Sequence, residues 1–324
     1  MTDANSDMKI NNQHEWDDLK EVVVGRWVRD TFETATVDAG FEELFPYIPE
    51  SAWLYLKEAE NQLLSDVYPE DDQLYHDEQE HLVEALEDFG VIVHRSDQIE
   101  FSTIATSQCY ARDPIVTIGN RFIITNMNLE SRRQETGNYR RIALDLASNY
   151  DGDVVSMPPL RPGDHEENAY LEGGDVFVNG TEIYVGVTGN ASNDRGIEWL
   201  RHELGDPYSV HKIPLSKNVL HLDCAMMLIN ETQGLICRED FADFDALPAS
   251  LQDREWVDVE PEQAQVMATN GVVINPSTVI LRDAFPEVAD RVRDMGIDVH
   301  EIPFKKADYF GGGLRCCYQP IARA

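Results

Sequence analysis

Two patterns of apolar and polar positions alternate along the chain. In the first, apolar residues at helical spacing lead to a glycine and then to a short β-branched stretch, as in HLVEALEDFGVIVHR at 81–95. The same order recurs in GIEWLRHELGDPYSVHKIPL at 196–215 and in VADRVRDMGIDVHEIPF at 288–304. Glycine commonly ends a helix, and a change from helical to alternating periodicity marks the start of a strand. Each segment therefore predicts a helix followed by a strand.

The second pattern predicts β-hairpins. PIVTIGNRFIIT at 114–125 has two apolar runs around Gly119-Asn120, and DVFVNGTEIYVGV at 175–187 has two around Asn179-Gly180. Asn-Gly is the strongest short-range hairpin signal, because both residues tolerate the positive φ of a tight turn. The pattern recurs with longer turns in AMMLINETQGLICR at 225–238 and GVVINPSTVILR at 271–282.

The two patterns follow one another along most of the chain with weak self-similarity. Units of this size bury little apolar surface alone, so we expect the copies to pack radially into one closed body. No stretch rich in proline and serine and no block of charge divides the sequence. We therefore expect a single domain over residues 1–324, with residues 1–13 as a flexible N-terminal tail.

The composition limits the classes of partner. The chain has 60 Asp or Glu residues against 26 Lys or Arg, and its formal net charge at pH 7 is -34. Such a chain repels nucleic acid backbones and anionic membrane surfaces, so neither is expected as a partner. A hydrophobic fraction of 42% is that of a folded protein. The even spread of acidic residues indicates a solvated surface that favours solubility, rather than a functional acidic patch.

The cysteines indicate an intracellular protein with reduced thiols. Cys109, Cys224, Cys237, Cys316 and Cys317 are odd in number and have neither a disulfide-framework spacing nor a Cys-x-x-Cys pair. No structural zinc site is therefore expected. The N-terminal segment MTDANSDMKINNQHEWDD contains no apolar run, and no apolar stretch is long enough to cross a membrane. We expect a cytoplasmic location.

Two segments that precede predicted hairpins carry acidic residues. In Cys109-Tyr-Ala-Arg-Asp113-Pro, an Asp before Pro is typical of a turn, and the functional alternative is a carboxylate that anchors a cationic substrate. In Leu171-Glu172-Gly-Gly-Asp175, the two glycines allow a tight turn that points the Glu172 carboxylate inward. A purely structural turn is the alternative here as well.

A third segment, Val219-Leu-His221-Leu-Asp223-Cys-Ala-Met-Met, places two ionisable residues in an apolar run. We interpret the run as a strand, in which residues i and i+2 point to the same face. A lone core histidine is the simpler alternative. A His and an Asp on one buried face, however, need partners or a function.

The fourth segment, Phe310-Gly-Gly-Gly-Leu-Arg315-Cys316-Cys317-Tyr-Gln-Pro320, places thiols directly after a glycine run. Glycine backbone can approach a ligand closely, whereas the usual alternative for a single cysteine is an inert core residue. Together the four segments supply a nucleophile, a base, an orienting carboxylate and two acidic anchors. These are the components of covalent catalysis.

These motifs resemble the glycine amidinotransferase-like family of the guanidine-modifying superfamily, which also contains arginine deiminase and dimethylarginine dimethylaminohydrolase. HEWDDLKEVVVGR at 14–26 is similar to that family's Asn-Glu-Trp-Asp-Pro-Leu-x-Glu-Val opening, and ARDPIVTIGNRFIITNMNLESRRQETGNYRR at 111–141 to its Ala-Arg-Asp segment. The resemblance continues through LEGGDVF, GIEWLR, LHLDCAMM and GGGLRCC, over most of the chain. It implies an α/β fold, a pseudo-fivefold α/β propeller of ββαβ-type modules.

The resemblance also implies roles for individual residues. Cys316 takes the place of the nucleophile, His221 that of the acid–base histidine, and Glu172 that of the carboxylate that orients the histidine. Asp113 and Asp223 correspond to the two carboxylates that hold the guanidinium. Cys317 is a bystander in this scheme.

Three arginines are further candidates for substrate binding. Arg112 and Arg315 stand directly before Asp113 and Cys316 within the matching motifs. In glycine amidinotransferases, an Arg downstream of the catalytic histidine binds the carboxylate of the donor. Arg238 lies near the matching place in this chain.

The activity implied by the resemblance is ping-pong transfer of the amidino group of L-arginine to an amine, with release of ornithine. Cys316 attacks the guanidinium carbon as a thiolate, and His221 protonates the departing amine and later deprotonates the acceptor. Glycine is the acceptor by analogy, and other primary amines stay open. The chemistry needs no metal and no organic cofactor, and homodimers would fit the family.

The same catalytic residues also serve hydrolysis, in which water replaces the amine. Many amidinotransferases have Asp-Ala-Ala-Asp where this chain has Glu172-Gly-Gly-Asp175, and the Glu form is the one that hydrolytic relatives carry. The N-terminal opening and the segment 126–141 resemble amidinotransferases more than deiminases. We therefore favour transfer, with a guanidine hydrolase of the arginine deiminase or dihydrolase type as the alternative.

Two other classes of function stay open. Asp164-His165-Glu166-Glu167 is a candidate metal site, but consecutive residues of a strand point to opposite faces and converge poorly. A solvated loop is the favoured interpretation of that segment. An inactive acidic binding module is the remaining alternative.

Overall fold

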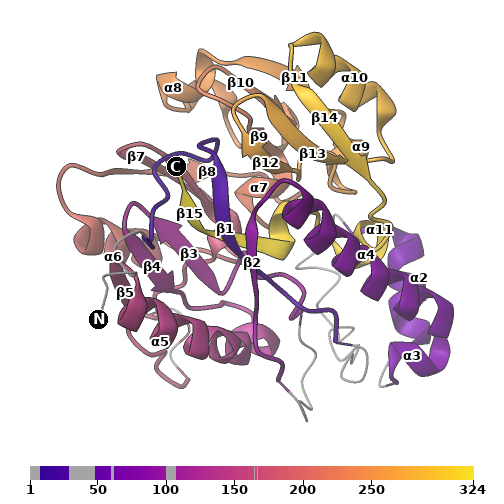
Figure 1. Cartoon of the computed structure of the whole chain (residues 1–324), viewed down its shortest axis with the longest axis horizontal. Coiled ribbons are helices and arrows are strands. Elements are labelled where there is room, and N and C mark those ends of the chain that lie inside the picture. Colours follow the sequence, from indigo (N-terminus) through magenta and orange to yellow (C-terminus); the bar gives the residue numbers. More distant parts are fainter. Residues whose placement is uncertain (1–7, 29–47, 60–61, 100–106, 164, 166) are drawn as a thin grey trace.

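The computed structural model describes residues 8–28, 48–59, 62–99, 107–163, 165 and 167–324. These residues form a mixed α/β structure with five three-stranded β-sheets. Figure 1 shows the longer helices at the periphery of the molecule and the strands toward its middle.

All five sheets of the described residues share one plan. Two strands pair antiparallel, and a third strand pairs parallel with the central one. In sheet order, the strands are β15 (Tyr318–Arg323), β1 (Leu19–Val24) and β2 (Ile92–Arg95); β3 (Ile115–Ile118), β4 (Arg121–Ile124) and β5 (Asp153–Ser156); β6 (Val176–Asn179), β7 (Glu182–Val187) and β8 (Ser209–Pro214); β9 (Met226–Leu228), β10 (Gln233–Ile236) and β11 (Glu255–Asp258); β12 (Val272–Asn275), β13 (Thr278–Arg282) and β14 (Asp298–Ile302).

Helical segments connect each central strand to its parallel neighbour, because parallel strands cannot be joined by a tight turn. They are α2 (Glu50–Glu58), α3 (Leu64–Val67) and α4 (Pro69–Asp88) in the first sheet; η2 (Glu130–Tyr139) and α5 (Arg140–Asn149) in the second; α6 (Asp194–Leu204) in the third; η4 (Arg238–Asp240), η5 (Phe244–Ala246) and α8 (Ala249–Gln252) in the fourth; and α10 (Pro286–Asp294) in the fifth. Each sheet with its connection is therefore one repeat of a common unit.

The three predicted helix–strand segments are confirmed as α4–β2, α6–β8 and α10–β14. Gly90, Gly205 and Gly296 follow the three helices with φ values of 78°, 60° and 83°. This left-handed region is open to glycine at little cost, so these glycines end the helices and turn the chain back toward the sheet.

The four predicted hairpins are confirmed as β3–β4, β6–β7, β9–β10 and β12–β13. In β6–β7 the turn lies one residue later than predicted, because Asn179 pairs with Glu182 and the connecting residues are Gly180 and Thr181. Gly180 has a φ of 61° and supplies the left-handed conformation of this turn.

The first sheet joins strands from opposite parts of the sequence. β1 pairs antiparallel with β15, with Val23 opposite Gln319, and pairs parallel with β2. Figure 1 shows the yellow strand β15 beside the indigo strand β1. Because β15 directly follows Cys316, this pairing fixes the position of the thiol.

The segment before β1 is ordered by backbone pairing. Ile10 donates to the carbonyl of Asp151 at 3.0 Å, and Asn12 exchanges hydrogen bonds with Gly119. The exposed fraction of Ile10 is 1%. The expected flexible tail over residues 1–13 is therefore wrong for residues 9–12, and residues 1–7 lie outside the described part of the chain. The sequence expectation failed because isolated bridges leave no local periodic pattern.

A short turn or helix precedes the first strand of several sheets. These segments are η3 (Gly173–Asp175) before β6, α7 (Leu222–Ala225) before β9, α9 (Pro261–Ala264) before β12, and α11 (Ala307–Phe310) with η6 (Arg315–Cys317) before β15. Arg238 lies in η4 between β10 and β11, whereas the other predicted site residues lie at or beside these segments or, for Arg112 and Asp113, just before β3. The repeat therefore places them at equivalent positions of different units.

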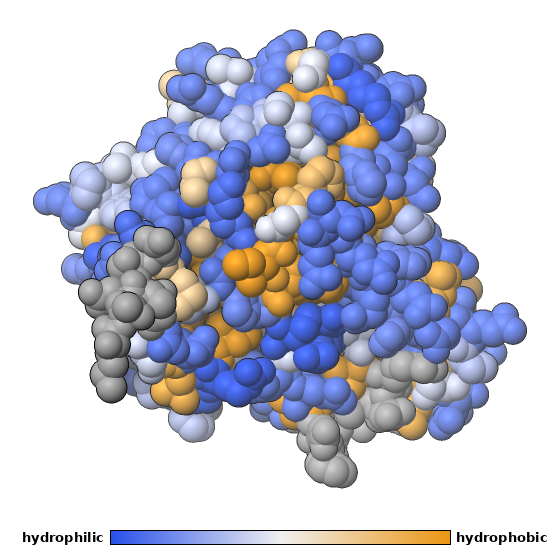
Figure 2. Space-filling view, in the orientation of Figure 1, coloured by the Kyte–Doolittle hydropathy of each residue, from blue (hydrophilic) through white to orange (hydrophobic). Residues whose placement is uncertain are grey.

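The core is formed by apolar residues from several sheets. Val22 of β1, Leu235 of β10 and Ile280 of β13 belong to one buried cluster, whereas Ile123 and Ile183 belong to a second one. Figure 2 shows a largely hydrophilic surface, with apolar residues gathered near the middle of the face that is drawn. None of the helices in the described part of the chain is both long and apolar enough to cross a membrane.

Candidate active site

Cys316 lies in the 3₁₀ turn η6 with its thiol against two polar side chains. Its Sγ accepts a hydrogen bond from Nδ2 of Asn270 at 3.2 Å and lies 3.7 Å from Oδ2 of Asp223. Burial, together with the carboxylates of Asp223 and Asp113, raises the pKa of the Cys316 thiol well above its usual range. The protein's own side chains therefore favour the protonated thiol.

His221 is held between two carboxylates. Its Nε2 lies 2.8 Å from Oε2 of Glu172, and its Nδ1 lies 3.7 Å from Oδ1 of Asp113. Burial works against the charged imidazole, but the negative charges of Asp113 and Glu172 outweigh it and raise the pKa of His221 to about 10. Glu172 is itself fixed, since its Oε1 accepts a hydrogen bond from the backbone N–H of Asn128 at 2.8 Å. The histidine is therefore cationic at neutral pH.

Asp113 has one oxygen in an ion pair and one that faces the histidine. Oδ2 accepts a hydrogen bond from Nη1 of Arg132 at 2.7 Å, and Arg132 also pairs with Glu135 at 2.9 Å. Burial alone would raise the pKa of Asp113, but His221 and Arg132 lower it below its usual range. Oδ1 is buried and has no hydrogen-bond partner among the described residues. This charged oxygen is therefore available to an N–H donor in the site.

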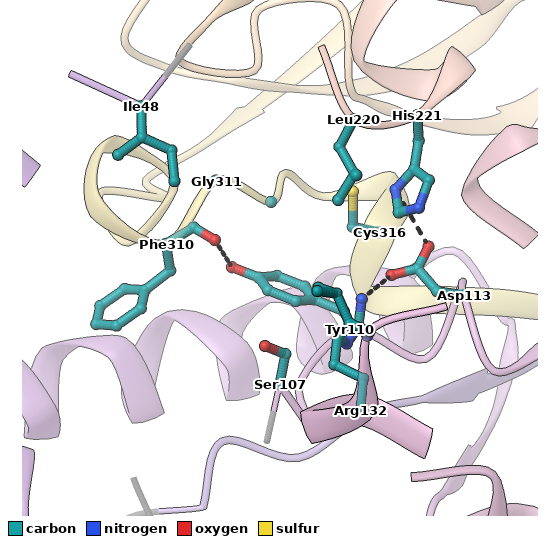
Figure 3. A pocket seen from close by; sticks show the side chains of 12 residues that line it. Ile48, Ser107, Tyr110, Asp113, Arg132, Leu220, His221, Phe310, Gly311 and Cys316 are labelled. Atoms are coloured by element: carbon teal, nitrogen blue, oxygen red, sulfur yellow. Dashed lines mark hydrogen bonds and ion pairs between the residues drawn. The ribbon is translucent and has the colours of Figure 1, made fainter. Parts of the chain in front are cut away.

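A cavity of about 100 Å³ joins these groups (Figure 3). Its polar wall contains Cys316, His221, Asp113, Arg132, Tyr110 and Ser107, and its apolar wall contains Ile48, Leu129, Leu220 and Phe310. In Figure 3 the sulfur of Cys316 and the imidazole of His221 point toward the same space, with Asp113 beside the imidazole. The lining residues thus come from three repeats of the fold, those of β15–β1–β2, β3–β5 and β9–β11.

Asp223 lies behind Cys316 in a buried ion-pair chain. Arg315 donates from Nη1 to Oδ2 of Asp223 at 3.0 Å and from Nη2 to Oε2 of Glu15 at 3.0 Å. The guanidinium also lies 3.9 Å from the ring centroid of Phe177. Both carboxylates keep the Arg315 guanidinium inside the protein next to Asp223, and this arginine does not line the cavity.

The other two candidate arginines also lie away from the cavity wall. Arg112 is buried, where Nε donates to the carbonyl of Arg315 at 3.2 Å and Nη1 donates to Gln319 at 2.9 Å. Arg238 is on the surface, where Nε donates to Oδ1 of Asp258 at 2.6 Å. The structure thus brings together the predicted Cys, His, Glu and two Asp residues. Arg112 adjoins them through its backbone N–H, which donates to the carbonyl of Cys316 at 2.9 Å, but it does not line the cavity, and Arg238 lies apart on the surface.

Two glycines make the close approach of these groups possible. A Cβ atom on Gly174 would lie 2.6 Å from Oδ1 of Asp113 and 2.8 Å from Nδ1 of His221. A Cβ atom on Gly173 would lie 2.0 Å from the carbonyl oxygen of Arg112. The Gly-Gly pair after Glu172 therefore leaves room for the backbone of Arg112 and for the side chains of Asp113 and His221.

The strand interpretation of the segment around His221 and Asp223 is wrong. His221 is extended, but Leu222–Ala225 forms the one-turn helix α7, and β9 begins only at Met226. The segment is buried on all sides, so its apolar residues mimic the pattern of a buried strand. His221 and Asp223 still reach the same nucleophile, from a turn rather than from one face of a sheet.

Sequence reasoning missed Arg132, Glu135 and Asn270. The pair Arg132 and Glu135 at i and i+3 on a polar helical segment is typical of an exposed ion pair, yet both residues are buried. Asn270 belongs to no recognisable motif. The feature that could have identified it is its position two residues before the strand β12. Asp113 and Cys316 occupy the same place before β3 and β15.

The candidate metal segment has other partners where it is described. His165 lies 3.2 Å from Nη2 of Arg133, and Glu167 pairs with Arg195 at 2.6 Å. Asp164 and Glu166 lie outside the described residues. Within the described part of the chain, no group of three or more His, Cys, Asp or Glu residues is arranged to hold a metal ion.

The arrangement can bind a small planar cation and transfer a proton beside it. Oδ1 of Asp113 has no hydrogen bond among the described residues and only a 3.7 Å ion pair with His221, so it can accept an N–H donor of a cation bound near the sulfur of Cys316 and the imidazole of His221. A cationic histidine donates a proton to a leaving group, and a thiol next to it is a nucleophile once deprotonated. The site therefore has the parts for covalent catalysis.

A family model described as N,N dimethylarginine dimethylhydrolase, eukaryotic, matches residues 59–323 of the chain. Among solved structures, an amidinotransferase of the saxitoxin biosynthetic pathway from Microseira wollei is similar with a TM-score of 0.76 and 20% identity, covering 97% of both chains. A dimethylarginine dimethylaminohydrolase from Pseudomonas aeruginosa complexed with citrulline has a TM-score of 0.66 and 17% identity, covering 94% of this chain and 99% of that chain.

Sequence relatives fall into the same groups. Inosamine-phosphate amidinotransferase 1 from Streptomyces griseus is 22% identical over 346 residues, 97% of either chain. Mitochondrial glycine amidinotransferase from Gallus gallus is 23% identical over 372 residues, which cover 99% of this chain and 84% of the relative. Arginine deiminase from Listeria innocua is 26% identical over 255 residues, which cover 66% of this chain and 61% of the relative.

Proposed function

The chain belongs to the N,N-dimethylarginine dimethylhydrolase family of the guanidine-modifying superfamily, and from its similarity to amidinotransferases of that superfamily we propose that it is an amidinotransferase that acts on L-arginine. The observation that carries the proposal is the convergence of Cys316, His221 and Oδ1 of Asp113 on one cavity; this oxygen has no hydrogen bond among the described residues and only a 3.7 Å ion pair with Nδ1 of His221. Transfer is favoured because two amidinotransferase relatives align with 97% and 99% of the chain, whereas the arginine deiminase aligns with 66% of it; the hydrolase family model, which matches residues 59–323, supports the second candidate below.

In the first half-reaction the substrate supplies the charge that the site lacks. A guanidinium is planar, fully protonated and rich in N–H donors. Bound against Asp113 and near Asp223, it would offset the carboxylates that, together with burial, raise the pKa of Cys316, so the thiol would release its proton to solvent and become the thiolate. The sulfur then forms a bond to the guanidinium carbon. The carbon–nitrogen bond to ornithine breaks, and the leaving amine takes a proton from the cationic His221.

In the second half-reaction the neutral His221 acts as the base. It removes a proton from the incoming amine, which attacks the amidino carbon held on Cys316. The carbon–sulfur bond breaks, the thiolate leaves, and the product is a new guanidino compound. The short contact of Glu172 with Nε2 keeps the imidazole in one orientation through both steps.

Arg132 is the best candidate for the residue that binds the donor carboxylate. It lines the cavity, whereas Arg238 lies on the surface against Asp258. Arg132 is already anchored by Asp113 and Glu135, so its guanidinium is held in a fixed place beside the proposed guanidinium site. Roles of Arg112 and Arg315 in contact with substrate stay predictions, and their burial supports a structural role.

The test is incubation of the purified protein with L-arginine, with and without a panel of primary amines that includes glycine. Ornithine, citrulline and guanidino products are separated by liquid chromatography and identified by mass spectrometry. Ornithine that appears only with an amine, together with an equimolar guanidino product, would establish transfer and name the acceptor. If none of these products forms in any incubation, L-arginine is refuted as the donor.

A guanidine hydrolase is the second candidate, favoured by Glu172 and by the family model. Citrulline from arginine and water alone, or ammonia with ornithine, would establish it and refute transfer. Cys316→Ser is the control in both cases: it removes the nucleophile while keeping the shape of the side chain. An inactive binding module, the remote alternative, would show no turnover to lose.

We also propose that the five sheets close into a pseudo-fivefold α/β propeller and that residues 1–324 form one domain. The common plan of the sheets, the pairing of β15 with β1 and the likeness to the two solved structures support this. A homodimer and a cytoplasmic location stay predictions. Light scattering coupled to size-exclusion chromatography tests the first.

A further inference from the structure

Asn270 is buried beside the nucleophile, and the proposed reaction leaves it without a role. Its exposed fraction is 2%. Nδ2 donates to Sγ of Cys316 at 3.2 Å, and Oδ1 accepts a hydrogen bond from the backbone N–H of the same cysteine at 3.2 Å. One side chain therefore contacts both the reacting atom and the backbone that carries it.

The network fixes which end of the amide faces the sulfur. Nδ2 also donates to the carbonyl oxygen of Asp223 at 3.0 Å, and a carbonyl oxygen only accepts. The backbone N–H of Cys316 only donates, so it requires the amide oxygen. If the amide were flipped, its oxygen would face the carbonyl oxygen of Asp223, which is also an acceptor. Its NH₂ group would face the backbone N–H of Cys316, which is also a donor. The group that faces Sγ is therefore the NH₂, a hydrogen-bond donor.

The backbone holds Asn270 in place from both sides. Asn270 donates its N–H to the carbonyl of Met267 at 3.1 Å, and Met267 has a φ of 70°, in the left-handed region that methionine rarely adopts. The carbonyl of Asn270 accepts the N–H of Leu314 at 3.1 Å. A Cβ atom on Gly313 would lie 2.5 Å from Oδ1 of Asn270, so the glycine run lets the nucleophile loop rest on this amide. The turn and the loop form one rigid unit.

The repeated plan of the sheets also places Asn270 among the site residues. Asn270 lies two residues before β12, Asp113 two residues before β3, and Cys316 two residues before β15. Glu172, Asp175, His221 and Asp223 lie at the entries to the remaining first strands, β6 and β9. Each of the five sheets therefore has a polar residue of the site just before its first strand, and Asn270 is that residue for the sheet of β12, β13 and β14.

The electrostatics around Cys316 show what this donor does. Asp223 lies 3.7 Å from Sγ, and its carboxylate opposes the negative charge of a thiolate. The amide of Asn270 has the opposite effect, because an N–H donor binds a charged sulfur more strongly than a neutral thiol. We propose that Asn270 is a catalytic residue that stabilises the thiolate of Cys316, both when it attacks the substrate and when it leaves the covalent intermediate. The assignment of the substrate rests on the proposed function, whereas the effect on the thiol does not.

The first test measures the thiol without any substrate. The rate of Cys316 alkylation by iodoacetamide is followed from pH 6 to pH 11 by mass spectrometry of the peptide that carries it, with fragment ions separating Cys316 from Cys317. The pH at which the rate reaches one fixed value on the rising limb, common to all variants, is taken as the midpoint of the profile, so the full titration of this thiol need not be reached. In Asn270→Ala, the midpoint of the rate profile should move at least one pH unit upward, a tenfold loss in the thiolate equilibrium. An unchanged midpoint would overturn the proposal, whatever reaction the protein catalyses.

Asn270→Leu separates donation from space filling. The leucine side chain has about the size of the amide and carries no charge, but it loses the donor to Sγ. Its midpoint should move upward about as far as that of Asn270→Ala. If Asn270 only fills space, Asn270→Leu would keep the profile of the wild type, and this result would refute a role in donation.

Thr269→Val is the matched control. Thr269 is equally buried in the same turn, and its hydroxyl donates to the carbonyl of Cys224 rather than to the nucleophile. The control should lose a structural hydrogen bond but keep the alkylation midpoint. Once a substrate is established, Asn270→Ala should lower kcat at least tenfold with KM changed less than threefold. An equal shift of the midpoint in Thr269→Val and Asn270→Ala would show that the effect is structural.

Discussion

His221 carries the charge on which both proposed half-reactions depend. Burial opposes that charge, but Asp113 and Glu172 raise the pKa of the imidazole to about 10. A cationic histidine at neutral pH suits the release of ornithine, which needs a proton. The base of the second half-reaction is then the neutral form that this release leaves behind. The pKa of His221 is therefore tuned to the first step.

Glu172→Gln tests this tuning. The neutral amide keeps the shape of the side chain but removes one of the two negative charges beside the imidazole, so the pKa of His221 falls. The alkaline limb of kcat/KM for arginine should therefore move to lower pH by at least one unit. The measurement is the pH–rate profile of both proteins from pH 6 to pH 11.

The same variant tests the stability linkage. A histidine whose pKa is raised from its ordinary value near 6.5 to about 10 on folding stabilises the protein fully below pH 6.5, and that contribution is lost as the pH rises to 10. Urea unfolding should therefore show the largest deficit of Glu172→Gln below pH 6.5 and a smaller one at pH 10.5. A deficit that grows with pH would contradict a cationic His221.

At the residue scale, motifs predicted the groups whose chemistry is unusual for their surroundings. A thiol after three glycines and a Glu before two glycines are visible in the sequence, and the structure brings Cys316 and Glu172 into one site. Arg132 and Asn270 were missed because a charged residue in a polar helix and an amide before a strand are common on surfaces. Only tertiary packing buries them beside Asp113 and Cys316.

At the element scale, Gly174 lets the segment before β6 pack closely against Asp113 and His221. A methyl group there would lie within 3 Å of both Asp113 and His221. Gly174→Ala should therefore lower turnover at least a hundredfold and lower the free energy of unfolding by about 1–3 kcal/mol, the usual cost of overpacking. The measurements are steady-state kinetics and urea unfolding.

Gly137→Ala is the control for that change. A Cβ atom on Gly137 would meet no heavy atom within 4 Å, and its backbone is not in the left-handed region. It should keep both turnover and stability. Wild-type turnover in Gly174→Ala would show that the entry to β6 can move away from the histidine, contrary to the close packing described above.

Strand β15 offers a second test at this scale. Ile321 is fully buried in a cluster with Val23, Ile115 and Phe122, so β15 joins the first sheet to the second. Ile321→Ala should lower the free energy of unfolding by about 2–5 kcal/mol. Ala322→Ser, on the opposite and partly exposed face of the strand, should change it by about 0.5 kcal/mol or less. A loss below about 1 kcal/mol in Ile321→Ala would indicate that β15 frays independently of the core.

The helix–strand and hairpin patterns were predictable because each is encoded within 12 to 20 consecutive residues, about the length of one such supersecondary unit. The pairing of β1 with β15 was not, because it joins Leu19 to Arg323 and leaves no local signal. α8 also escaped notice, since a helix of four residues has no periodicity to detect. The strand assigned around His221 failed for the related reason that α7 is a single buried turn.

At the scale of the whole molecule, the sequence indicated a repeated architecture but not the way in which its units meet. Alternating units predicted radial packing, and the five sheets of the described residues do share one plan. The units carry different polar residues at equivalent entries, which is why one site draws on residues more than 200 positions apart, such as Asp113 and Cys316. Shared geometry with divergent side chains is difficult to recognise in one sequence, because the apolar pattern alone repeats.

The net charge of -34 leads to a last prediction, which concerns stability rather than catalysis. Self-repulsion of a strongly charged surface destabilises the compact state, and salt shortens its range from about 10 Å at 0.1 M to about 3 Å at 1 M. The midpoint of thermal unfolding should therefore rise by several degrees between 0.1 M and 1 M NaCl at pH 7. KCl should act equally, because screening depends on ionic strength. The buried pairs of Arg132 with Glu135 and of Arg315 with Glu15 are sheltered from the solvent, so salt should weaken them little. A midpoint that falls with salt would show that attractive surface ion pairs outweigh the repulsion.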